Sequence, residues 1–130
     1  MKLYSLWDLP QSDRLSTIVS ETLARGGVVS AVCHGPAGLV SSKTAAGEPV
    51  VKGGKVAAFT NAEESAVGLA ETVPFLLESR LRELGADVQV ADNFEAYVIA
   101  DGNLITGQNP MSSELVAQKV LSAISAAAAV

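Results

Sequence analysis

Apolar residues recur every three or four positions in several parts of the chain, which is the spacing of one helix face. The set Leu15, Ile18 and Leu23 is the clearest example. Ser12 before this set and Gly26 after it are residue types that typically begin and end a helix. The expected helices span residues 12–25, a segment from Ala62, a segment from Pro74 to Leu84, and a final segment from about Ser113.

Short apolar runs between these helices predict β-strands. Residues 28–32 form a nearly continuous apolar run, which is typical of a parallel strand covered by helices on both faces. Asp101-Gly102 separates two further runs, and this dipeptide favours the two-residue turn of a β-hairpin. The polar, glycine-rich residues 42–54 are expected to form a surface loop. The expected strands span residues 28–32, 55–59, 88–90, 97–100 and 103–106.

This order of elements indicates the fold class. Helices that alternate with short apolar strands are typical of an α/β sandwich with a mainly parallel sheet, here with an antiparallel hairpin at one edge. The chain has 130 residues, of which 48% are hydrophobic. That is enough to bury a core without disulfides or metal, so we expect one domain over residues 1–130.

The charge and composition exclude several classes of function. Nine Lys and Arg stand against fourteen Asp and Glu, a formal net charge of -5, and the basic residues are not clustered. We therefore expect no binding to nucleic acid or to a membrane, and the absence of a signal-peptide or bilayer-length apolar segment favours a cytoplasmic protein. Gly53-Gly54-Lys55 lacks the remainder of a phosphate-binding loop, and one Cys with one His is too few for a usual metal site, so no cofactor and no metal are expected.

The segment GGVVSAVCHGPAG places Cys33 in a tight turn between a strand and a helix. The positive end of a helix dipole lowers a thiol pKa, and nearby backbone N–H groups stabilise an oxyanion, so this position favours a reactive thiolate. The adjacent His34 is suited to proton transfer near neutral pH. The alternative interpretation is that Cys33 is a small buried apolar residue and His34 an ordinary turn residue.

Two acidic residues, Glu63 and Glu64, follow the strand expected over residues 55–59 and begin a helix. Acidic residues stabilise the start of any helix, so capping alone explains them. The functional interpretation is that one of them orients His34, as a carboxylate does in a nucleophile–base–acid triad. Both segments end at the carboxyl edge of the predicted sheet, where such sites assemble.

The motifs AVCHGPAGLV, GKVAAFTNAEESAVGL, VPFLLESRLRELGA and DGNLITGQNP together resemble the DJ-1/PfpI superfamily, with its Hsp31-like group the most similar branch. The resemblance extends from about Leu6 to Leu121. It implies a flavodoxin-like three-layer sandwich, a homodimer, and a triad of Cys33 as nucleophile, His34 beside it and Glu64 as the acidic member, Glu63 being the less favoured candidate. It further implies glutathione-independent conversion of methylglyoxal to lactate, with deglycase and holdase chaperone activities also associated with the group.

The chain departs from the family pattern at its start, because family members carry about a hundred residues before this point. Those residues supply the opening strands, a glutamate that hydrogen-bonds the cysteine, and a glycine-rich turn. We therefore expect impaired catalysis, and an exposed edge at the strand over residues 28–32 that pairs with a second copy or a complementary chain. The alternatives to a glyoxalase-like lyase are a non-enzymatic interaction subunit or stress holdase, and an amidase or peptidase.

Overall fold

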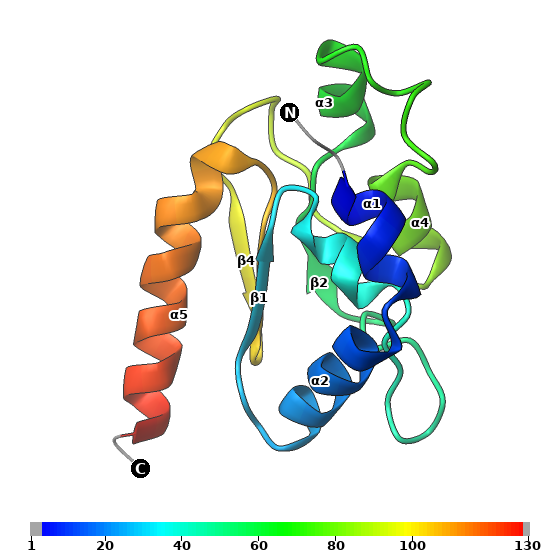
Figure 1. Ribbon diagram of the computed structural model, residues 1–130. Helices are drawn as coiled ribbons and strands as arrows, with labels where there is room; N and C mark the ends of the chain where they lie inside the picture. The colour runs from blue at the N-terminus through cyan, green and yellow to red at the C-terminus, as the bar shows by residue number, and fades with distance from the viewer. Residues whose placement is uncertain (1–3, 129–130) are drawn as a thin grey trace.

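A computed structural model describes residues 4–128 (Figure 1). The expected domain boundaries, 1 and 130, lie outside the described residues. The chain is mixed α/β, with a mostly parallel arrangement of strands as the sequence predicts.

The main sheet has three strands in the order β1-β5-β4, with β5 (Leu104–Gly107) in the centre. β5 pairs in parallel with β1 (Val29–Val32) and antiparallel with β4 (Val98–Asp101). Asp101 pairs with Leu104, so the two-residue turn is Gly102-Asn103 rather than the expected Asp101-Gly102. Gly102 has φ +57°, a left-handed conformation that glycine adopts without steric cost.

Helices cover both faces of this sheet and complete the three layers. The C-terminal helix α5 (Ser113–Ala128) packs along one face, against all three strands. On the other side, α2 (Asp13–Ala24) and the short 3₁₀ helix η2 (Gly35–Leu39) contact β1 (Figure 1). The predictions for both α-helices are confirmed, and the Ser12 side chain accepts a hydrogen bond from the Leu15 N–H at 3.2 Å as the N-cap of α2.

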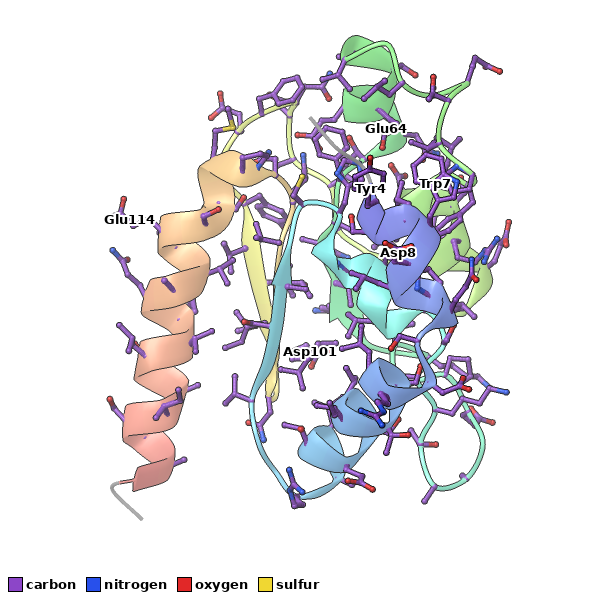
Figure 2. The ribbon with its side chains drawn as sticks, viewed as in Figure 1. Tyr4, Trp7, Asp8, Glu64, Asp101 and Glu114 are labelled. Carbon is purple, nitrogen blue, oxygen red and sulfur yellow. The ribbon has the colours of Figure 1, made fainter. Side chains whose placement is uncertain are left out.

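A second, two-stranded parallel sheet joins β2 (Lys55–Val56) to β3 (Asp87–Val88). Both strands are shorter than expected, and β2 ends where the next residue, Ala57, bonds to the main sheet instead. The Ala57 N–H donates to Thr106 Oγ1 at 2.9 Å. The Lys55 N–H donates to Asp101 Oδ2 at 2.7 Å, at the hairpin end labelled in Figure 2.

The remaining helices are short. The expected helix start at Pro74 is wrong by three residues, because α4 begins at Leu77, whose side chain is buried together with that of Leu81. The short helices besides η2 are α1 (Tyr4–Asp8), η1 (Leu9–Gln11), α3 (Asn61–Ala66), α4 (Leu77–Glu83) and η3 (Pro110–Ser112).

One segment differs from its expected exposure. The loop over residues 42–54 is not confined to the surface, because Ser42 and Val51 are fully buried. Trp7 is 39% exposed on α1.

The strand β1 lies at the edge of the main sheet. The N–H groups of Val29 and Cys33 point toward β5 and donate to the carbonyls of Asn103 and Gly107, at 2.9 and 3.0 Å. Backbone groups alternate in direction along a strand, so those of Ser30 and Val32 face the open edge. Beside this edge, between β1 and α2, lies an apolar groove of about 350 Å³, whose lining includes Leu15, Ile18, Val29 and Leu39.

Candidate active site

Cys33 follows the last residue of β1 in a left-handed conformation, with φ +64°. Its N–H donates to the Gly107 carbonyl at 3.0 Å, and its carbonyl accepts from the Phe59 N–H at 2.9 Å. These two bonds hold the backbone where the chain turns out of the sheet into η2. The sequence therefore predicted the sharp strand-to-helix turn, although the helix that follows is a five-residue 3₁₀ helix.

His34 and Glu64, thirty residues apart, are brought together beside the thiol. His34 Nε2 lies 2.7 Å from Glu64 Oε2, and His34 Nδ1 lies 3.3 Å from Cys33 Sγ. An ionised carboxylate only accepts hydrogen bonds, so the Nε2–H of His34 donates to Glu64 and Nδ1 is left to accept the thiol proton. His34 is 5% exposed and Glu64 2% exposed, so water competes little for this contact.

The structure brings the side chains of Cys33, His34 and Glu64 together in the order thiol, imidazole, carboxylate. Such an order allows a thiol to pass its proton to the imidazole while the carboxylate stabilises the imidazolium. Figure 2 labels Glu64 on α3, whose first turn carries the acidic pair. Glu64 Oε1 is buried and has no hydrogen-bond partner among residues 4–128.

The expectation of a lowered Cys33 pKa is wrong for this chain. The pKa of the Cys33 thiol is raised to about 11, chiefly by burial and to a smaller extent by the negative charges of Glu63 and Glu64, against a lowering by the backbone N–H of His34. The helix that follows, η2, is a 3₁₀ helix of only five residues. At rest the site therefore holds a protonated thiol.

Glu63, the less favoured of the two acidic residues, is fully buried and has another set of partners. Its Oε1 accepts from the Thr60 N–H and hydroxyl at 3.0 and 3.1 Å, which forms a capping box at the start of α3. Its Oε2 accepts from the Phe94 N–H at 2.8 Å and from Asn109 Nδ2 at 2.9 Å. Glu63 therefore caps α3, whereas Glu64 is the member of the pair that contacts His34.

Sequence reasoning missed two residues near the site. Asn109, in the segment GQNP, is fully buried and ties Glu63 to the Glu95 carbonyl. Phe94 has φ +61°, and its ring lies 6.1 Å from that of Phe59, which in turn lies 4.4 Å from the His34 ring. No local pattern marks either contact, because each joins segments far apart in the sequence.

Within residues 4–128 no group of three or more His, Cys, Asp or Glu side chains is placed to hold a metal ion. None of the described helices is long and apolar enough to cross a bilayer.

The fold and the turn at Cys33 define the class of protein. The chain belongs to the DJ-1/PfpI family, whose model matches residues 6–123.

Three similar proteins within this family show what the chain resembles. The glutathione-independent glyoxalase HSP31 of Saccharomyces cerevisiae is 35% identical over 128 residues, which cover 92% of this chain and 53% of the relative. The crystal structure of glyoxalase III from Candida albicans is 31% identical with a TM-score of 0.86, over 92% of this chain and 52% of that one. The Rapid Encystment Protein of Francisella tularensis is 36% identical with a TM-score of 0.91, over 93% and 54%. The chain thus spans about half the length of the curated relatives it matches.

Proposed function

We propose that this chain carries a cysteine-dependent glyoxalase site that acts on small reactive carbonyls, with methylglyoxal converted to lactate, in the cytoplasm. The observation that carries the proposal is the contact of His34 with both Cys33 and Glu64, at 3.3 and 2.7 Å. The similarity to proteins named glutathione-independent glyoxalases supports the same substrate class.

The proposed reaction needs no oxidant or reductant. His34 Nδ1 takes the Cys33 proton, and the sulfur bonds to the aldehyde carbon of methylglyoxal to give a hemithioacetal. A proton then moves from this carbon to the neighbouring carbonyl carbon through an enediol, which leaves a lactyl thioester on Cys33. Water hydrolyses the thioester, so that lactate is released and the thiol is restored. Glu64 stabilises the imidazolium that forms in the first step.

We infer that the chain alone turns over slowly. With a pKa of about 11, roughly one Cys33 thiol in ten thousand is ionised at pH 7, so attack on an aldehyde starts from a rare species. His34 is placed to remove the proton, but no described residue other than the His34 N–H lowers the thiol pKa. A donor group from another polypeptide near the sulfur would correct this deficit.

The test is lactate production from methylglyoxal, without glutathione, by the parent chain and by Cys33→Ala and Glu64→Gln. We expect weak turnover in the parent that falls to background in Cys33→Ala and nearly so in Glu64→Gln. Equal lactate formation by parent and Cys33→Ala would refute the enzymatic proposal. Robust parental turnover that Cys33→Ala abolishes would instead refute the inference that the chain alone is slow.

A second candidate function, an interaction subunit, is favoured by one observation, the open edge of β1 beside the apolar groove. We propose that a strand of a second copy of this chain pairs with the backbone of Ser30 and Val32. Light scattering should then give a dimer mass for the parent and for Ser30→Ala, and a monomer for Ser30→Pro, which lacks the edge-facing N–H. A monomeric, stable parent chain would contradict this proposal.

A further inference from the structure

We propose that Glu63 is a positioning residue of the site: its buried carboxylate fixes α3 and the loop over residues 91–97, and thereby holds the Glu64 carboxylate and the ring of Phe59 against His34. The significance of this role for catalysis rests on the proposed function, whereas the positional effect itself does not. Glu63 touches neither Cys33 nor His34 in any hydrogen bond, so it acts through its neighbours.

The two adjacent carboxylates are saturated to different degrees. Glu63 accepts four hydrogen bonds, two on each oxygen, whereas Glu64 accepts one, from His34. These donors keep Glu63 ionised despite its full burial, since they lower the pKa of its carboxyl against the opposing effect of desolvation. The Glu63 carboxylate is therefore held in place by its donors, whereas Glu64 bonds only to the imidazole.

The four donors come from three separate segments. Thr60 caps α3, Phe94 lies 31 residues further along the chain, and Asn109 lies 46 residues from Glu63, after β5. α3 has only six residues, too few to be stable without tertiary contacts. Asn61 ties the start of α3 to Glu78 and Ser79 of α4, and the Glu63 bonds fix the helix from the other segments, and with it the place of Glu64.

The same carboxylate also fixes the aromatic side of His34. Phe94 is held in its left-handed conformation by the bond from its N–H to Glu63, and its ring packs 6.1 Å from Phe59. Phe59 lies 4.4 Å from the imidazole. Both the polar and the apolar neighbours of His34 thus depend on one buried charge.

Glu63→Gln tests the positioning role, because glutamine has almost the same shape as glutamate. An amide has one oxygen and one NH₂ group. If the NH₂ group faces Phe94 and Asn109, two of the four hydrogen bonds are lost; if it faces Thr60, the bond from the Thr60 N–H is lost, while the Thr60 hydroxyl can accept instead of donate. Glu83→Gln is the matched control, because the Glu83 side chain on α4 is 72% exposed. Asn109→Ala is a second variant, which removes one of the four donors to Glu63 together with the bonds of the Asn109 side chain to the Glu95 carbonyl and the Ser112 hydroxyl.

The readout uses the fact that His34 is the only histidine in the chain. Solvent exchange of its Nε2–H, followed by NMR, reports the bond to Glu64, and the amide of Ile105 in the buried centre of β5 reports opening of the whole fold. We expect the His34 proton to exchange about tenfold faster in Glu63→Gln, as for loss of about one hydrogen bond, with a smaller change at Ile105. Asn109→Ala should show the same pattern more weakly, and Glu83→Gln no change.

A purely structural capping role predicts another result. In that case the His34 and Ile105 protons accelerate by the same factor, or neither accelerates, and either outcome overturns the proposal. If Glu63→Gln does not fold, Asn109→Ala decides by the same comparison. Lactate is not measured here, so an inactive enzyme with faster His34 exchange in Glu63→Gln refutes the proposed function and leaves the positioning role standing.

Discussion

Alkylation of Cys33 tests the electrostatics of the site directly. The pKa of about 11 leaves roughly 0.01% of the thiol ionised at pH 7, against about 3% for an ordinary thiol with a pKa near 8.5, a ratio of about 300. A more basic thiolate is also a stronger nucleophile. With a Brønsted slope near 0.4–0.5, the pKa difference between about 11 and about 8.5 makes the Cys33 thiolate roughly ten times more reactive than an ordinary thiolate. We therefore expect folded Cys33 to react about 30-fold more slowly than an ordinary thiol.

The assay is iodoacetamide labelling followed by intact mass, between pH 6 and pH 10. Cys33 is the only cysteine, so the mass change reports one site, and the chain in concentrated urea supplies the ordinary thiol as an internal reference. The folded rate should keep rising up to pH 10, whereas the unfolded rate levels off near its ordinary pKa. A folded rate at pH 7 that equals or exceeds the unfolded rate would show that burial does not control this thiol.

Three further outcomes can be measured by unfolding experiments. Gly107→Ala should destabilise the fold by about 1–3 kcal/mol in urea, because the added Cβ would lie 2.7 Å from Val116 Cγ2, and an unchanged midpoint would contradict this packing. Thr106→Val should cost about 1–3 kcal/mol, since it leaves the buried Ala57 N–H without its acceptor, and Thr106→Ser should restore most of the loss. The pKa of Cys33 is higher in the folded state, so the stability that its protonated thiol contributes is complete below its ordinary pKa and is lost as the pH rises toward about 11. Cys33→Ala should therefore flatten the decline of thermal stability above about pH 9.

The sequence predicted those parts of the fold that depend on local spacing. α2, α5 and β1 were placed to within about a residue because apolar periodicity and capping residues mark them directly. The strand expected over residues 55–59 was too long, because Ala57 bonds to a threonine side chain of the main sheet rather than to a strand. This hydrogen bond joins residues far apart in the chain, so no local sequence pattern predicts it.

In the candidate site, too, the sequence predicted the features that depend on local residues but not those that depend on tertiary contacts. The turn at Cys33 follows from the glycines and proline after it, but the direction of its pKa depends on burial and on two carboxylates thirty residues away. The assignment of Glu64 to His34 and of Glu63 to capping also required the fold. Adjacent residues on a helix face different ways, and only the packing of α3 decides which one meets the imidazole.

The positive φ at Cys33 sets activity against stability at a single position. A left-handed backbone costs a side-chain-bearing residue about 1–2 kcal/mol, whereas glycine adopts it without that steric cost. Replacing Cys33 by glycine would relieve this strain as it removes the thiol, while alanine would keep the strain and remove the thiol all the same. A variant of this chain selected only for thermal stability is therefore expected to lose the proposed nucleophile to glycine.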